Sequence, residues 1–188
     1  MTVTIPKIIT LEEFLTLSET KPASEYIDGE IIQKPMPKGR HSSLQSELCT
    51  AVNQVAKTGK IAYAFPELRC TFGGRSIVPD VAVFRWQHIP FNAEGEILDD
   101  FNLVPDWTIE ILSPEQNPNK VIGNILHCLR HGCQLGWFID PDDRSILTFL
   151  PGQQPELKQG SDSLPVLEGL QLELTVDLIF GWLKMGKN

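Results

Sequence analysis

Two acidic residues stand inside apolar runs of the sequence: Asp80 between Ile77 and Val83, and Glu110 between Thr108 and Leu112. An ionised carboxylate is costly to bury without a partner. If the two runs are paired strands, the carboxylates lie about 5 Å apart, and they repel unless a cation or a proton comes between them. Mg²⁺ typically takes one or two carboxylates plus water and phosphate oxygens. The pair therefore predicts a divalent-metal site.

Packing offers an alternative explanation of the same two acids. Each carboxylate can form an ion pair with an arginine, and the nearby candidates are Arg69, Arg75 and Arg85. The metal interpretation requires that both acids converge on one cation instead.

Several apolar segments are typical of strands. They run over residues 61–72, 76–84, 107–112, 134–139 and 145–150, and Gly73-Gly74-Arg75 predicts a turn between the first two. Alternation along a strand would place Val78, Asp80, Ala82 and Phe84 on one face. An Asp-Gly pair at Asp28-Gly29 predicts a further hairpin over residues 26–32.

Helical spacing of apolar residues predicts helices over residues 41–57, 119–131 and 176–184. A short helix is expected after Thr10, which can form a capping box with Glu13, and Ser42 or Ser43 is a candidate cap for the helix at residues 41–57. The order of elements predicts an α/β fold, with a mixed sheet, helices packed against it and an antiparallel meander.

The 188 residues suit one domain spanning 1–188. With 24 acidic and 16 basic residues, the net charge of −8 argues against broad coating of nucleic acid, although Lys34, Lys38 and Arg40 form a small basic loop suited to phosphate. Four cysteines without CxxC spacing argue against a disulfide framework or structural zinc. No apolar run is long enough to span a membrane, and the N-terminus lacks a signal-peptide pattern, so a cytoplasmic location is expected.

A series of short motifs resembles the Uma2 (DUF820) family, in order from about residue 10 to residue 150. These motifs are Tyr26-Ile27-Asp28-Gly29-Glu30, Gly39-Arg40-His41, Pro66-Glu67, Val78-Pro79-Asp80-Val81-Ala82-Val83, Pro105-Asp106-Trp107-Thr108-Ile109-Glu110-Ile111-Leu112-Ser113-Pro114 and Gly136-Trp137-Phe138-Ile139-Asp140-Pro141. The resemblance implies a PD-(D/E)xK nuclease with a restriction-endonuclease-like α/β core. That family is abundant in cyanobacteria, and its members are mostly described as endonucleases without a demonstrated substrate.

The resemblance also implies roles for particular residues. Asp80 and Glu110 would be metal ligands for Mg²⁺ or Mn²⁺, and the backbone carbonyl of Ile111 would supply a third oxygen. Glu30 and His41 match positions that often line such a site.

The sequence departs from the nuclease pattern at the lysine. That pattern expects lysine two residues after the Glu, where this chain has Leu112, and in the resembling family the lysine usually aligns with Asn124. Lys120 lies one helical turn before Asn124, and its long side chain makes it the predicted catalytic lysine.

The leading hypothesis is metal-dependent hydrolysis of DNA by Asp80 and Glu110, assisted by Lys120. A second hypothesis is a nuclease-derived module that binds nucleic acid or a protein without cutting, which Leu112 and the acidic net charge favour. A third is metal-dependent chemistry on another phosphate ester. Because nucleases that cut both strands often act as symmetric pairs, a homodimer is a further expectation.

Overall fold

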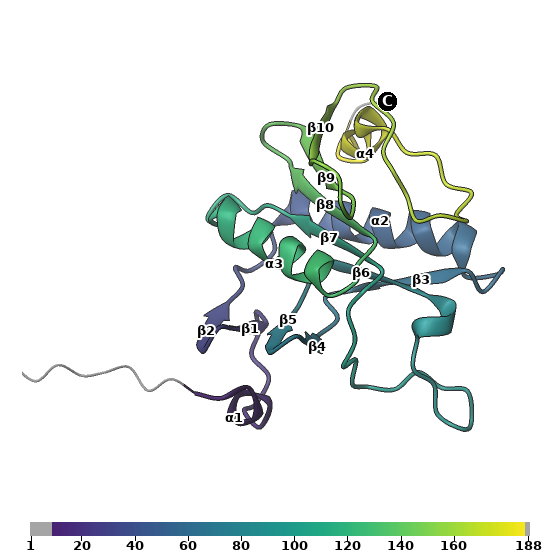
Figure 1. The fold of residues 1–188 in the computed structure, drawn as a ribbon. Coiled ribbons are helices and arrows are strands. Elements are labelled where there is room, and N and C mark those ends of the chain that lie inside the picture. Colours follow the sequence, from purple (N-terminus) through teal and green to yellow (C-terminus); the bar gives the residue numbers. More distant parts are fainter. Residues whose placement is uncertain (1–8, 187–188) are drawn as a thin grey trace, which may run out of the picture.

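Two β-sheets form the framework of the computed structural model, which describes residues 9–186 (Figure 1). One sheet has the strand order β10-β9-β8-β7-β6-β3, and it contains β3 (Ala62–Pro66), β6 (Val81–Arg85), β7 (Trp107–Ile111), β8 (Leu135–Asp140), β9 (Ser145–Phe149) and β10 (Glu156–Gln159). The other has the order β2-β1-β5-β4, and it contains β1 (Ser24–Ile27), β2 (Glu30–Gln33), β4 (Cys70–Phe72) and β5 (Arg75–Ile77).

Helices cover both faces of the six-stranded sheet. The helical elements are α1 (Leu11–Leu15), α2 (Gly39–Ala56), the short 3-10 helix η1 (Trp86–His88), α3 (Pro118–Arg130) and α4 (Val176–Gly181). Helix α2 contacts β3, β6 and β7, whereas α3 contacts β7 and β8 from the opposite face (Figure 1). The expected α/β fold with a mixed sheet is confirmed, because β7 and β8 are parallel and joined through α3, while the other neighbours in this sheet are antiparallel.

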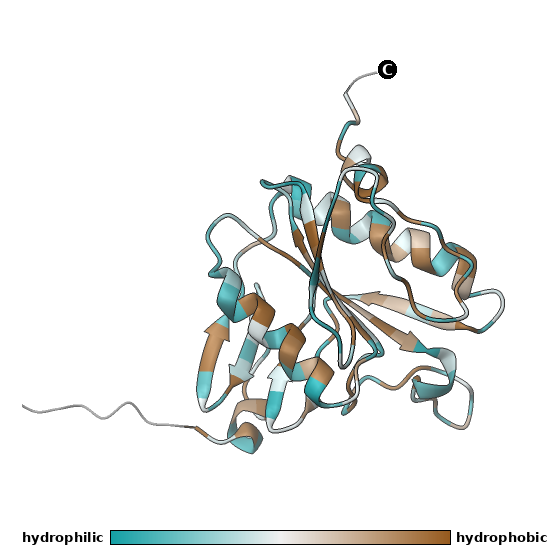
Figure 2. Ribbon diagram, turned by 45° about the horizontal axis from the view of Figure 1, so that its top comes forward, coloured by the Kyte–Doolittle hydropathy of each residue, from teal (hydrophilic) through white to brown (hydrophobic). Residues whose placement is uncertain are grey.

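The alternation of side chains along β7 divides the core into two layers. Trp107, Ile109 and Ile111 pack into the cluster beneath α2, and all three are fully buried. Thr108 and Glu110 take the positions between them, which alternation turns toward α3. Helix α3 packs with a separate cluster that includes Ile125 and Phe138, and brown apolar residues recur along it in Figure 2. Glu110 is therefore the one acid in a strand that is otherwise apolar or uncharged.

Two predicted strands are each broken in the structure. The segment 61–72 divides into β3 and β4, and the segment 76–84 divides into β5 and β6, with the two halves in different sheets. Glu67 has a positive φ of 46°, which turns the chain out of β3. Pro79 has no N–H to give to a ladder, so the chain leaves β5 before it enters β6. The prediction that Asp80 lies within a continuous strand was wrong.

Local signals predicted the hairpin and the capping box correctly. Ile27 pairs with Glu30 across Asp28 and Gly29, both with positive φ, and Thr10 forms its capping box. Helix α2, however, begins at Gly39 and has Lys38 as an N-cap without a side-chain cap bond. Ser42 and Ser43 lie inside that helix, so the predicted serine cap was wrong.

Three further expectations concern the chain as a whole. The absence of a signal peptide was inferred from the N-terminal segment, and residues 1–8 lie outside the described residues. Over residues 9–186, none of the helices combines the length and the apolar character that crossing a bilayer requires. All four cysteines are free.

Gly136 is expected to be intolerant of even a methyl group. A Cβ at this position would lie 2.4 Å from Cγ2 of Ile125, where α3 crosses β8. Because overpacking of this kind forces side chains off their rotamers, Gly136→Ala should lower the free energy of unfolding by about 1–3 kcal/mol in urea. Gly123→Ala is the matched control, since a Cβ there meets nothing within 4 Å and alanine favours helix by about 0.5–1 kcal/mol. Equal stability of the two variants would contradict this packing.

Candidate active site between the two sheets

Asp80 and Glu110 come together where β6 begins and β7 ends. Val81 pairs with Ile109 across the two antiparallel strands, so Asp80 and Glu110 occupy the next opposed positions. Asp80 is 1% exposed and Glu110 is 2% exposed. The predicted pairing of the two strands is confirmed, although Asp80 reaches its place just ahead of β6 instead of within it.

The carboxylate of Asp80 is held by donors from three different elements. Its Oδ2 accepts a hydrogen bond of 2.7 Å from the Ile111 N–H and lies 3.1 Å from Nε2 of His41. Its Oδ1 accepts a hydrogen bond of 2.6 Å from Lys34. Gln45 donates to the backbone carbonyl of Asp80 at 2.7 Å. Asp80 is thus fixed by β7, by the first turns of α2 and by the end of β2.

The arginine alternative fails, because the three candidate arginines have other partners. Arg69 bonds to Glu19. Arg75 bonds to Asp28, and Arg85 donates to a backbone carbonyl in the C-terminal segment.

Lys34 is the cation between the two acids. Its Nζ lies 2.6 Å from Oδ1 of Asp80 and 3.8 Å from Oε2 of Glu110, and its side chain is only 10% exposed. The Lys34 N–H bonds to the carbonyl of Ala23, which extends the β1–β2 ladder by one step and holds the lysine at the end of β2. The hairpin thereby delivers a lysine from one sheet to the acids of the other.

A third buried acid, Glu25 on β1, lies on the wall of a cavity that Lys34 and Glu110 also line. Its Oε1 accepts the Val78 N–H at 2.8 Å and its Oε2 accepts a bond of 3.1 Å from Asn124 of α3. Lys34 donates to the carbonyl of Val78 at 2.6 Å. Side chains therefore satisfy the backbone groups of the segment that crosses between the sheets, where no ladder is available.

Burial and neighbouring charges shift the pKa values of the three acids in different directions. Burial alone would raise the pKa of Asp80, but the Lys34 ammonium and His41 outweigh it and hold that pKa below its ordinary value. Burial raises the pKa of Glu110 well above its ordinary value, and the charges of Asp80 and Glu25 add to the rise against the opposing effect of Lys34. Burial also raises the pKa of Glu25. One cation therefore does not compensate all three carboxyl groups.

The charge and the free acceptors of this cluster fit a divalent cation. With all three carboxyl groups ionised, the one ammonium would leave two uncompensated negative charges, the charge that one divalent cation balances. Within residues 9–186, Oε1 of Glu110 and Oδ1 of Asn124 are buried acceptors without a hydrogen bond. No set of three or more His, Cys, Asp or Glu in that range is arranged as a metal site. A divalent cation such as Mg²⁺, which takes one or two carboxylates with water and phosphate oxygens, could be held by the free oxygen of Glu110.

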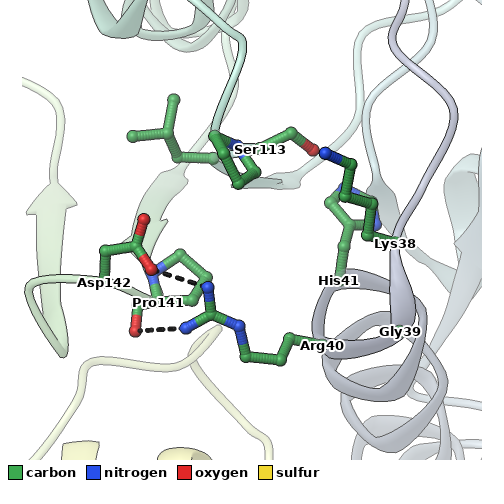
Figure 3. A pocket seen from close by; sticks show the side chains of 9 residues that line it. Lys38, Gly39, Arg40, His41, Ser113, Pro141 and Asp142 are labelled. Carbon is green, nitrogen blue, oxygen red and sulfur yellow. Dashed lines mark hydrogen bonds and ion pairs between the residues drawn. The ribbon is translucent and has the colours of Figure 1, made fainter.

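Two cavities adjoin the acids. The larger, of about 470 Å³, is lined by Glu25, Ile27, Ile32, Gln33, Lys34, Pro35, Glu110, Glu115, Gln116, Asn117, Lys120, Val121 and Asn124. The smaller, of about 200 Å³, lies at the start of α2, where His41 forms part of the wall. Arg40 pairs with Asp142 across this second pocket, and Lys38 lies on the side near Ser113 (Figure 3). Basic side chains therefore border the acid cluster on both sides.

The structure separates the predicted site residues into two groups. Asp80, Glu110 and His41 come together, and Ile111 joins them through the hydrogen bond of its N–H to Asp80. That its carbonyl binds a metal stays a prediction. Lys120 is exposed on the wall of the larger cavity. Glu30 is exposed at the hairpin turn and is absent from the walls of both cavities, so its predicted place in the site was wrong. The acid that the hairpin turns inward is Glu25.

Comparison with known proteins decides the family. The sequence model of Uma2, described as "Putative restriction endonuclease", matches residues 11–178. The chain belongs to the Uma2 family. A solved structure described as a "putative nuclease belonging to DUF820", from Anabaena variabilis ATCC 29413, shares 53% sequence identity with this Uma2 chain. The likeness covers 93% of this chain and 99% of that one, with a TM-score of 0.91. Comparison with curated proteins finds no match.

The Uma2 resemblance and the residue patterns both missed three members of the cluster in their observed roles. Glu25, Lys34 and Asn124 come from β1, the end of β2 and α3, and no local spacing links them. One signal was present, because Glu25 opposes Ile32 in the hairpin and Lys34 follows Ile32 by two residues. Glu25, Ile32 and Lys34 therefore lie on one face of the hairpin, and the two-residue period of a strand could have indicated this.

Proposed function

We propose that this chain is a divalent-metal-dependent endonuclease that hydrolyses DNA phosphodiester bonds at Asp80 and Glu110. The observation that carries the proposal is the convergence of these two buried carboxylates at opposed positions of β6 and β7, with Glu110 on the wall of an open cavity. Membership of a family described as restriction endonucleases supports the same chemistry.

In this mechanism, a water oxygen forms a bond to phosphorus, and the bond from phosphorus to the sugar oxygen breaks with its electron pair on the leaving oxygen. The water loses one proton to solvent and the leaving oxygen gains one, which gives a phosphomonoester and a hydroxyl. Mg²⁺ or Mn²⁺, when bound, polarises the phosphate and lowers the pKa of its bound water.

The residues of the chain orient the reacting groups. The Ile111 N–H and His41 hold the Asp80 carboxylate in one orientation, while Glu110 keeps one acceptor oxygen without a hydrogen bond. Lys120, on the cavity wall, and Arg40, beside the smaller pocket, are placed to contact phosphates of the strand. Few basic side chains take part, which agrees with the acidic net charge of −8.

Plasmid cleavage tests the proposal directly. With Mg²⁺ or Mn²⁺ present, Asp80→Asn and Glu110→Gln should each lower the rate by about 100-fold or more, as expected when a group that stabilises the transition state is lost. Glu94→Gln is the matched control, because Glu94 is an exposed acid in a loop. Equal cleavage by all four proteins would show that the activity comes from elsewhere.

A second candidate is a module that binds nucleic acid without cutting. The contact that favours it is the 2.6 Å ion pair, in which Lys34 already neutralises Asp80 without a metal. Calorimetric titration of the folded protein with Mn²⁺ separates the two functions. Heat of binding that is lost in Glu110→Gln supports the endonuclease, and no uptake of Mn²⁺ supports the binding module.

A further inference from the structure

Hydrolysis of a phosphodiester needs a positive group that faces the charge developing on the phosphate. Two lysines line the larger cavity, Lys34 and Lys120, and their surroundings differ. Lys120 is an exposed residue in the first turn of α3. Lys34 is buried, with its ammonium within 4 Å of both Asp80 and Glu110. Only Lys34 is already held at the acids.

Hydrogen bonding leaves Lys34 with capacity for a ligand. An ammonium has three N–H donors. Two of them have short bonds of 2.6 Å, one to Oδ1 of Asp80 and one to the carbonyl of Val78. The third group in reach, Oε2 of Glu110, is 3.8 Å away, which is beyond a hydrogen bond. Among residues 9–186, the third donor of this cavity-lining lysine thus has no hydrogen-bond acceptor, and it can bond to an oxygen that enters the cavity.

The position of Lys34 is fixed before any substrate arrives. The β1–β2 ladder holds its backbone, and the Val78 carbonyl and Asp80 hold its side chain. An exposed lysine such as Lys120 must lose side-chain entropy to reach the same point. Preorganised donors contribute most to stabilising a transition state, because they need no rearrangement at the moment of reaction.

We propose that Lys34, delivered by the β1–β2 hairpin, is the catalytic lysine of this site and donates a hydrogen bond to a non-bridging oxygen of the scissile phosphate. This inference rests on the proposed endonuclease activity. Lys34 takes part through charge and a hydrogen bond only, so it neither loses nor gains a proton in the reaction. The bonds that form and break are those of the hydrolysis described above.

The test compares Lys34→Gln with Lys120→Gln in plasmid cleavage and in calorimetric binding of Mn²⁺. Lys34→Gln should lower cleavage about 100-fold while it still binds Mn²⁺. Lys120→Gln removes only a contact to a phosphate of the strand, so it should lower cleavage by less than about tenfold. A double variant, Lys34→Gln with Asn124→Lys, returns a lysine to the same cavity from α3, beside Glu25. It should regain about tenfold in cleavage, because the cationic donor is restored. A lysine with a purely structural role would not be replaced from another element in this way.

Each outcome decides for or against Lys34. Cleavage by folded Lys34→Gln within threefold of the unaltered chain overturns the inference, and so does loss of cleavage together with loss of Mn²⁺ binding, which would make Lys34 a support for the acids. If Lys34→Gln melts below the assay temperature, the double variant takes its place: cleavage by it supports the inference, and a folded, inactive double variant overturns it. Absence of cleavage by the unaltered chain overturns the proposed function, and this inference falls with it.

Discussion

Asp80→Ala is expected to lower the free energy of unfolding by about 3–5 kcal/mol, the usual cost of removing one partner from a buried ion pair. The loss leaves the ammonium of Lys34, whose side chain is 10% exposed, without its closest anion, and it leaves the Ile111 N–H without its acceptor. Glu110 lies 3.8 Å from the same ammonium and can take over part of the pairing, so the lower end of the range is expected. Urea unfolding at pH 7 measures the change.

Two companion variants identify the cause. Asp80→Asn keeps an oxygen that can accept the Ile111 N–H, so it should cost less than Asp80→Ala. Asp80→Ala combined with Lys34→Met removes both charges and should recover part of the loss, because a buried pair contributes little beyond an apolar replacement of similar size. A loss below about 1 kcal/mol in Asp80→Ala, or no recovery in the double variant, would show that the pair does not govern stability here.

This cluster illustrates which features of a fold local patterns reveal. The capping box at Thr10, the turn at Asp28-Gly29 and the helical spacing in α3 depend on residues a few positions apart, and the structure confirms all three. The approach of Asp80 to Glu110 also followed from a local pattern. Each of two apolar runs contains a single acid, which is costly to bury alone and therefore predicts a partner in the other run.

The contact of Lys34 with Asp80 could not be found in this way. Lys34 and Asp80 are 46 residues apart, and their contact depends on the break between β5 and β6, which moves the chain from one sheet to the other. A proline in a strand-like run indicates a bend, but it does not show where the chain goes next. Glu25 faces the cavity, whereas Glu30 is exposed, because of the way in which the hairpin packs. That packing depends on tertiary contacts that no window of sequence contains.

The affinity for Mn²⁺ is expected to rise steeply with pH. Burial raises the pKa of Glu110 well above its ordinary value of 4.5, so at a pH below the raised value Glu110 carries a proton that a metal must displace. Each pH unit should then increase the affinity by up to about tenfold, until Glu110 is ionised in the free protein. Calorimetry in buffers of different ionisation enthalpy measures both the affinity and the number of protons released.

Without metal, the Glu110 contribution to the free energy of unfolding must fall as the pH rises, whereas the affinity for Mn²⁺ rises. Folded Glu110 holds its proton more tightly than the unfolded chain does, so its contribution to the free energy of unfolding is greatest below pH 4.5 and is lost as the pH rises through the raised pKa. Glu110→Gln should reduce this decline, of which Glu25 with its own raised pKa retains a part, and should also flatten the pH dependence of Mn²⁺ binding. Mn²⁺ affinity that stays constant with pH in the unaltered chain, or an unchanged slope in Glu110→Gln, would mean that the proton lies elsewhere in the cluster. Asp80, whose pKa is lowered, is ionised throughout this range, so the two acids prepare the site differently: Asp80 as a fixed negative charge, and Glu110 as a ligand that exchanges its proton for the metal.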